Sequence, residues 1–333
     1  MLAFVTGSTG FIGLNLIEQL TAVGWNVVAL HRQSSDLTYL KRFDVRRVIG
    51  DIVDIAAVER AMPEEVDAVF HTAADLSSWS HNNERQTRTN IHGTHNVVST
   101  ALKRGAKRFV HTSTSSVYGL VSTLVDETAP QLGRGSWFNY IHTKTVAEDV
   151  VRKGIERGLD AVILNPTHVI GRYDRHNWSR LILLAAKGGL PRIPPGSGSF
   201  CHGGEVARAH IAAVAKGQKG ENYLLAGANA TFAEVVATAG HLLGRRFEAR
   251  TVPAPIVRVS ATLLNLLSHF SGKEPLITPE AAALITINGS FRSDKATQKL
   301  NYRPVPLREM LKDCCDWLVE EGLLERALSS ENP

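Results

Sequence analysis

The sequence predicts an α/β fold: a doubly wound parallel sheet with helices on both faces, followed by a smaller, mostly helical region. Two observations support this prediction. Short apolar runs alternate with amphipathic segments of helical length over the first half of the chain, which is typical of parallel strands joined by crossover helices. A glycine-rich turn at residues 6–13 joins the first apolar run to the first amphipathic segment. We therefore expect strands that end at one ligand-binding edge.

The first thirty residues predict an anion site. Residues 2–5 are expected to form a buried strand and residues 14–20 a helix, which ends at Gly24 before a second strand at 25–30. A helix start offers unpaired N–H groups and a positive dipole end, and glycines let a pyrophosphate approach the backbone. In this strand–turn–helix context the glycines indicate dinucleotide binding. The expected contacts are Gly7, Thr9, Gly10, Phe11, Ile12 and Gly13.

The end of the second strand distinguishes two cofactors. Folds that bind NAD usually place an acid here, which accepts hydrogen bonds from the ribose hydroxyls. This chain instead has His31, Arg32, Ser34 and Ser35. A guanidinium stabilises an extra phosphate on the ribose, and a carboxylate would repel it. The sequence therefore predicts NADP(H), with NAD(H) as the alternative, and Arg32 as the phosphate ligand.

Three further strands are expected to complete the nucleotide site. They are predicted at residues 45–49, 68–71 and 109–112. After the third strand, Asp51 can accept a hydrogen bond from the adenine amino group while Ile52 packs on the ring. The fourth strand ends in small residues, which leave room for a nucleotide crossing the strand ends: Thr72, Ala73 and Ala74.

The residues after the fifth strand predict proton-transfer chemistry. A hydroxyl cluster at residues 112–116 precedes Tyr140 and Lys144, which open a helical pattern at 145–156. Tyr and Lys four positions apart on a helix share one face. The ammonium is expected to lower the phenol pKa, ordinarily about 10, by favouring the phenolate. The hydroxyl cluster would hydrogen-bond a substrate oxygen as charge develops on it.

The connecting segments are also predicted. We expect a loop at residues 79–88, a helix at about 90–103 and a mobile, glycine- and proline-rich loop over the active site at 188–204. The strongly apolar helix at 253–270 is expected to cover the substrate pocket. A membrane-surface role for that helix is the alternative, although few basic residues are available for its polar face.

Composition describes an ordinary globular protein. The chain has 333 residues, 44% of them hydrophobic and 21% charged. Its net charge of +5 is spread along the chain without a basic stripe, so we expect no nucleic-acid partner. We expect no membrane span, because no run reaches about eighteen uncharged apolar residues, and a cytoplasmic location, because the N-terminus is already the first strand. Neither the three cysteines nor the thirteen histidines have metal-ligand spacing, so no metal site is expected.

Together these motifs resemble the extended short-chain dehydrogenase/reductase family of the NAD-dependent epimerase/dehydratase superfamily, in its dihydroflavonol-reductase-like branch. The resemblance implies a Rossmann-type NADP-binding domain at 1–165, with a returning segment at about 205–226. It implies a substrate-binding region made of 166–204 and 227–330. The matching pieces are residues 6–13, 50–51, 70–74, 90–94, 112–114, 140–144, 165–166, Gly227 and 300–304.

The resemblance also assigns roles. Tyr140 matches the family's proton donor, and Lys144 matches its partner, which also holds the nicotinamide ribose. Thr114 stands where the family has a catalytic serine; Ser113 and Ser115 flank it, so the hydrogen-bonding hydroxyl could be any of the three. The remaining cofactor contacts implied are Thr112, Pro166 and Val169.

Two departures weaken substrate inference by analogy. His168 is an unusual occupant of the segment that anchors the nicotinamide, and Gly203, Gly204 and Glu205 replace the family's common Val-Asp-Asp. In relatives that stretch packs beside the substrate cleft.

The expected activity is NADPH-dependent reduction of a carbonyl, an aldehyde or ketone, or the reverse oxidation. The apolar stretch at 256–267 indicates that the small-molecule substrate is hydrophobic. Alternatives are a nucleotide-sugar epimerase, a 3β-hydroxysteroid-type dehydrogenase, or a non-catalytic redox sensor. Ser115 and Ser116 stand where dehydratases have an Asp-Glu pair, which argues against elimination chemistry. By analogy we expect a homodimer formed through the helices at 90–103 and 140–156.

Overall fold

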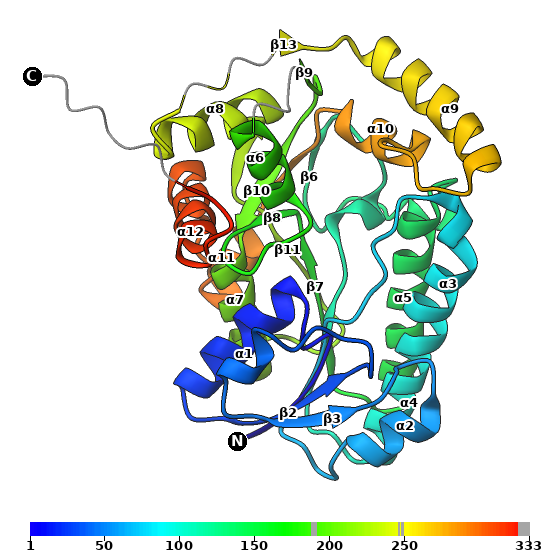
Figure 1. Cartoon of the computed structure of the whole chain (residues 1–333). Coiled ribbons are helices and arrows are strands. Elements are labelled where there is room, and N and C mark those ends of the chain that lie inside the picture. The colour runs from blue at the N-terminus through cyan, green and yellow to red at the C-terminus, as the bar shows by residue number, and fades with distance from the viewer. Residues whose placement is uncertain (188–191, 246, 248–249, 326–333) are drawn as a thin grey trace, which may run out of the picture.

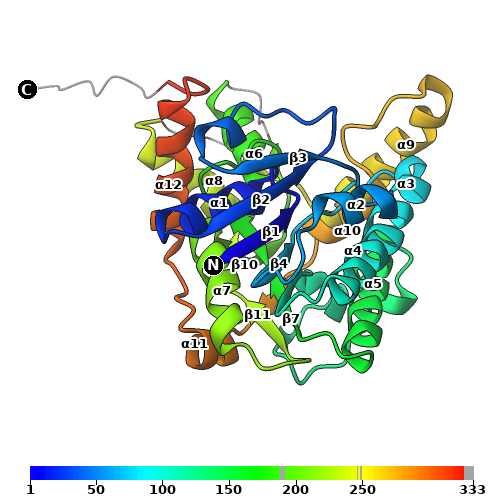
Figure 2. The ribbon, with the colours of Figure 1, turned by 90° about the horizontal axis from the view of Figure 1, so that it is seen from below.

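A seven-stranded parallel sheet forms the centre of the molecule (Figures 1 and 2). This computed structural model describes residues 1–187, 192–245, 247 and 250–325. The strand order β11-β7-β5-β4-β1-β2-β3 confirms the predicted doubly wound α/β fold. The strands are β1 (Leu2–Thr6), β2 (Asn26–His31), β3 (Arg46–Ile49), β4 (Ala68–His71), β5 (Phe109–Thr112), β7 (Ala161–Pro166) and β11 (Asn222–Leu225).

Alternating side chains of the central strand serve the two faces of the sheet. In β1, Ala3 and Val5 join one hydrophobic core and Phe4 joins the other, as the period of two in a strand requires. The first core is covered by α1 (Phe11–Ala22) and α7 (Gly203–Lys216). The second core is covered by α2 (Ile55–Ala61), α4 (Thr94–Lys103) and α5 (Asn139–Glu156).

The segment before β5 is helical over a longer stretch than predicted. Helix α3 (Asn83–Thr87) continues through a π-helix (Arg88–Gly93) into α4, so the predicted loop at 79–88 is wrong from residue 83 onward. The polar residues that suggested a loop include Glu84 and Arg85, which lie on an exposed helix surface. The side-chain amide of Asn90 binds both backbone groups of Asp75, which fixes the helix against the strand ends.

The segments after β5 add three small sheets and several helices to the main sheet. The sheets pair β12-β10-β8, β13-β9 and β14-β6. Their strands are β6 (Leu124–Val125), β8 (His168–Ile170), β9 (Arg192–Ile193), β10 (Ser197–His202), β12 (Ala228–Thr231), β13 (Arg250–Thr251) and β14 (Ser290–Phe291). The helices are α6 (Trp178–Ala186), α8 (Phe232–Leu242), α9 (Ala254–Ser271), α10 (Pro279–Ile285), α11 (Asp294–Leu300) and α12 (Leu307–Glu320).

The predicted mobile loop at 188–204 is largely structured. Its first four residues, 188–191, lie outside the described part of the chain. The remainder forms β9 and β10 and the start of α7, because β10 pairs with both β8 and β12. Gly198 is needed there, since a Cβ at that position would come within 2.5 Å of the His168 ring.

Helix α12 returns the end of the chain to the N-terminal half. The Trp317 ring lies 5.5 Å from the Tyr39 ring and 5.7 Å from the Tyr173 ring, between centroids. One hydrophobic core therefore contains residues from Ala3 to Leu324. Within the described residues, the structure has no helix with the length and apolar character needed to cross a bilayer.

Candidate active site

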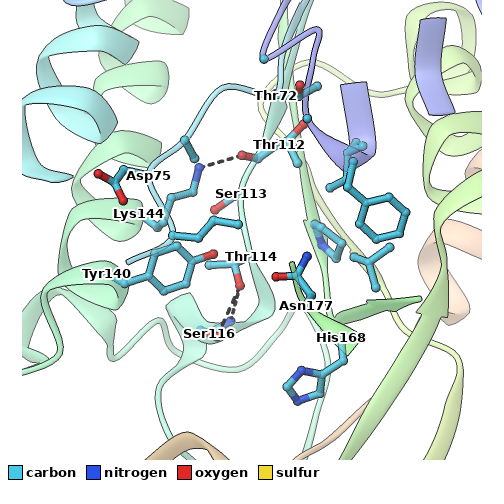
Figure 3. A pocket seen from close by; sticks show the side chains of 18 of the residues that line it. Thr72, Asp75, Thr112, Ser113, Thr114, Ser116, Tyr140, Lys144, His168 and Asn177 are labelled. Carbon is cyan, nitrogen blue, oxygen red and sulfur yellow. Dashed lines mark hydrogen bonds between the residues drawn. The ribbon is translucent and has the colours of Figure 1, made fainter. Parts of the chain in front are cut away.

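One cavity of about 820 Å³ runs along the carboxyl ends of the central strands. This is the edge at which open α/β sheets bind ligands. Figure 3 shows the part of this cavity where Thr114, Tyr140 and Lys144 lie together. All the predicted site residues line this cavity: Gly7, Thr9, Gly10, Phe11, Ile12, Gly13, Arg32, Asp51, Ile52, Thr72, Ala73, Ala74, Thr112, Thr114, Tyr140, Lys144, Pro166 and Val169.

The glycine turn brings an open helix start to the cavity. Gly7 has a φ of +69°, and a Cβ on Gly13 would lie 2.1 Å from the Gly7 carbonyl oxygen, so only glycine allows α1 to begin this close to β1. No side chain caps the first turn of α1, and that turn contains no acid. These unpaired N–H groups fit the pyrophosphate of a dinucleotide.

The end of β2 presents a cation to the cavity. Arg32 and Ser35 line it, and the Arg32 backbone N–H donates to the Ser35 hydroxyl at 3.1 Å. The next acid along the chain, Asp36, is held by the Thr38 backbone N–H at 2.9 Å and by Arg175 at 2.7 Å. The Thr38 hydroxyl, which also donates to Asp36 at 2.6 Å, contributes most, and together these bonds hold the pKa of Asp36 well below its usual range. The arrangement fits a ribose phosphate better than free ribose hydroxyls.

Thr114, Tyr140 and Lys144 come from two elements. Thr114 begins the 3₁₀ turn after β5, and its hydroxyl accepts a hydrogen bond from the Ser116 backbone N–H at 3.2 Å. Tyr140 and Lys144 lie one turn apart on α5. In Figure 3 the Tyr140 hydroxyl points toward Thr114. The Lys144 ammonium donates to the Thr112 carbonyl oxygen at 2.8 Å.

The expected lowering of the Tyr140 pKa by Lys144 is wrong for this structure. Burial raises the pKa of Tyr140, and a hydrogen bond with the Thr114 side chain offsets part of the rise. Burial also lowers the pKa of Lys144 to about 8, against the opposing effect of Glu148. For Tyr140, the desolvation penalty exceeds the stabilisation of the phenolate by the Thr114 hydrogen bond. Tyr140 is therefore a protonated acid at neutral pH.

A buried network fixes the backbone beneath this site. The Glu148 carboxylate, one turn beyond Lys144, is fully buried and accepts hydrogen bonds from Asn165 at 2.6 Å and Asn222 at 3.0 Å. The Asn165 amide also donates to the Thr114 carbonyl oxygen at 3.1 Å. The network ties α5, β7 and β11 to the turn that carries Thr114. The sequence analysis did not identify Glu148, because one acid on a helix gives no signal of its depth.

The candidate hydroxyls differ in their surroundings. The Thr114 hydroxyl interacts with both Tyr140 and Ser116. The Ser113 hydroxyl is buried and has no hydrogen-bond partner in the described part of the chain. The Thr114 hydroxyl thus lies next to the Tyr140 phenol, and Ser113 has bonding capacity left for a ligand.

The far half of the cavity is largely apolar. Its walls include Trp178 at the start of α6 and three residues of α10. The predicted covering helix at 253–270 forms α9, which contributes no residue to the lining and packs on the outside of α10. Thr278 followed by Pro279 is a helix-start signal that could have revealed α10. The apolar lining residues that the sequence analysis missed are Leu120, Val121, Phe138, Trp178, Ala281, Leu284, Ile285, Ile287 and Phe291.

His168 is a polar group in this apolar half. Its ring lies 5.4 Å from the Trp178 ring and 5.3 Å from the Phe200 ring, between centroids. Burial lowers the pKa of His168 to about 4, so the imidazole is neutral at physiological pH. Asn177 lines the cavity nearby (Figure 3). Both offer hydrogen bonds without charge.

The departure at residues 203–205 has a structural role. A Cβ on Gly203 would lie 2.9 Å from the Phe11 ring, so glycine lets α7 approach α1 closely. The buried Glu205 carboxylate pairs with Arg208 at 3.0 Å and Arg303 at 3.6 Å. None of the three residues lines the cavity, so the departure does not bear directly on its shape.

Comparisons with known proteins show the family of the chain. The sequence profile of the NAD dependent epimerase/dehydratase family matches residues 3–226. The sterol demethylase protein B of Methylococcus capsulatus is 29% identical, over 97% of this chain and 100% of that protein. A 3 beta-hydroxysteroid dehydrogenase/Delta 5-->4-isomerase of Mycobacterium tuberculosis is also 29% identical, over 95% of this chain and 90% of that protein.

The fold recurs in solved structures. The crystal structure of gox2253 superposes with a TM-score of 0.84 and 28% identity, covering 97% of this chain and 99% of that one. A protein of Synechocystis named putative dihydroflavonol 4-reductase is 26% identical, over 97% of this chain and 96% of that protein. The resemblance to extended short-chain dehydrogenases/reductases is thus confirmed. The chain belongs to the NAD dependent epimerase/dehydratase family and is an NAD(P)-dependent oxidoreductase.

Proposed function

We propose that this protein is an NADP(H)-dependent oxidoreductase that interconverts a ketone and a secondary alcohol on an apolar, sterol-sized substrate. The observation that carries the proposal is the position of Thr114, Tyr140 and Lys144 at the junction between the nucleotide groove and the apolar half of one cavity. The names of two relatives, a sterol demethylase protein and a 3 beta-hydroxysteroid dehydrogenase, support a substrate of this class.

The chain's own groups suit the reaction. When bound, a nicotinamide cofactor supplies or accepts the hydride. Thr114 and Tyr140 hydrogen-bond the substrate oxygen, and Tyr140 transfers its proton to that oxygen as negative charge develops. The Lys144 ammonium donates a hydrogen bond to the Thr112 carbonyl oxygen, which holds this lysine in the cavity one turn of α5 beyond Tyr140. The buried network of Glu148 and Asn165 keeps the Thr114 backbone in place.

Two observations favour this activity over sugar chemistry. Ser115 and Ser116 line the cavity where an eliminating acid and base would stand. Beyond Tyr140 the lining is mainly aliphatic and aromatic, whereas a nucleotide-sugar would need many charged or polar partners. Arg32 at the end of β2 supports NADP(H) over NAD(H).

The test is a pair of binding titrations with NADPH and NADH, followed by turnover of a panel of aldehydes, ketones and 3-ketosteroids. Tighter NADPH binding and turnover of the apolar ketones are expected. Preferential binding of NADH, or a bound NAD that never exchanges, would contradict the assignment and favour epimerase chemistry.

We also propose a homodimer that forms through α4 and α5, which lie side by side on one face of the sheet (Figure 2). Light scattering at micromolar concentration tests this. A mass of one chain per particle would contradict it.

A further inference from the structure

Helix α9 presents its large apolar side chains outward. Six of them recur at helical spacing along one face and are between 50% and 85% exposed: Ile256, Val259, Leu263, Leu266, Leu267 and Phe270. An ordinary surface helix turns such a face toward the core. We name these six residues the α9 face. Contiguous exposed apolar surface of this kind marks an interaction site.

The opposite face anchors the helix to the protein. Val257 and Ala261 of α9 pack against Ala282 of α10 in a small core of their own. Helix α10 in turn lines the cavity with Leu284 and Ile285. In Figure 1, α9 lies at the periphery and α10 lies between it and the rest of the molecule. The α9 face is thus one helix away from the apolar half of the cavity.

The charge around the α9 face is positive. Helix α9 contains no acidic residue, and its Arg258 donates a hydrogen bond to Thr286 on the side that faces α10. Arg250 and Lys273 are exposed beyond the two ends of the helix and flank the α9 face. Glu274 is the single acid between residues 250 and 276, so three basic residues less one acidic residue leave +2. Glu274 also lies close enough to Arg85 to stabilise the charge of that guanidinium.

We propose that the α9 face docks on the surface of an anionic lipid bilayer. The apolar side chains would enter the boundary between headgroups and acyl chains, and the flanking cations would pair with anionic headgroups. A second copy of the chain suits this face less well, because a two-fold contact sets the same positive segment opposite itself. Docking here would place the apolar half of the cavity beside the lipid that holds an apolar substrate, a consequence that rests on the proposed function.

The experiment is co-sedimentation of the purified full chain with vesicles of phosphatidylcholine and phosphatidylglycerol in equal parts. We expect binding that weakens with added salt and on vesicles of phosphatidylcholine alone. The double variant Leu263→Glu/Leu267→Glu should bind more than about tenfold more weakly, because it replaces two apolar side chains that would enter the bilayer with carboxylates.

The matched control is Val23→Glu/Leu323→Glu, which alters two exposed apolar side chains outside α9 and should bind as the unaltered chain does. Circular dichroism confirms that both variants fold. Failure of the unaltered chain to sediment with either vesicle would overturn the proposal. So would light scattering that shows the lipid-free particle losing half its mass in the Leu263/Leu267 variant, because the face would then join two copies. The assay contains no cofactor or substrate, so its outcome is separate from that of the proposed activity.

Discussion

At the scale of single residues, the proton transfer proposed for Tyr140 can be tested separately from cofactor binding. Tyr140→Phe keeps the ring and removes the acid, so turnover should fall by about 10²–10⁴ while NADPH affinity stays the same. Tyr302→Phe is the matched control, because its buried hydroxyl has no hydrogen-bond partner among the described residues. Initial rates and fluorescence titration measure the two effects. Unchanged turnover in Tyr140→Phe would rule out the proposed acid.

Lys144 should make stability depend on pH. Its pKa in the folded protein is about 8, below the ordinary 10.5, so between these values the unfolded chain binds more protons than the folded one. The stability of the unaltered protein relative to Lys144→Met should therefore rise with pH, by about 2 kcal/mol from about pH 7.5 to about pH 9.5. Urea unfolding at both pH values measures it. The control is Lys153→Met, which alters an exposed lysine on the same helix. If the stability difference between the unaltered protein and Lys144→Met did not change with pH, the lowered pKa of Lys144 would be refuted.

Arg32 should separate the two cofactors. Arg32→Ala removes a charge-assisted contact worth about 1.5–3 kcal/mol, so NADPH affinity should fall about 10–100-fold with little change for NADH. Isothermal titration of both cofactors measures this. Arg47→Ala, which alters an exposed arginine on the neighbouring strand β3, should change neither affinity. Equal losses for NADPH and NADH would mean that Arg32 supports the fold and does not read the phosphate.

Residue identities were predictable where chemistry restricts them to a few types. Glycines at a tight turn and a Tyr–Lys pair after a hydroxyl cluster have few substitutes, and the structure places them along one cavity. The protonation of Tyr140 was not predictable, because it depends on burial, and burial depends on elements far along the chain.

At the scale of elements, the turn between β1 and α1 tolerates no added atom at Gly13. Gly13→Ala would place a methyl group 2.1 Å from the Gly7 carbonyl oxygen, so α1 must shift away from the strand. We expect loss of measurable NADPH binding and a lower melting temperature. Gly135→Ala is the control, since a Cβ there meets open space. Calorimetry with and without NADPH tests both, and normal binding by Gly13→Ala would contradict the close approach.

Periodicity predicted that elements exist but did not predict what they contact. The apolar pattern of α9 was clear in the sequence, and we assigned it to the pocket, whereas α10 occupies that position. An apolar stripe in the sequence predicts which face of a helix is apolar, but it does not predict which element packs against that face. The loop prediction failed at residues 83–88 for the opposite reason, since polar residues such as Glu84 and Arg85 lie on an exposed helical surface.

At the scale of the whole molecule, Trp317 joins the two ends of the chain. It is buried against Tyr39 and Tyr173. Trp317→Ala should cost about 3–5 kcal/mol of unfolding free energy. Trp137→Ala, which removes a side chain that is 61% exposed, should stay within about 0.5 kcal/mol. Denaturant titration should show one transition in each case, because one core spans both halves. A separate early transition in Trp317→Ala would show that α12 unfolds by itself.

The strand order also determines when each edge of the sheet can close as the chain is synthesised. The central strand β1 leaves the ribosome first, and β2 and β3 can pair outward from it on one side by residue 49. The other edge of β1 stays unpaired until β4, at residues 68–71, has been synthesised. The sheet is complete only after β11, at residues 222–225, has been synthesised. Growth of the nascent chain at about 5–20 residues per second leaves several seconds during which the groove for the adenine half of a dinucleotide has all its residues and the substrate half does not yet exist.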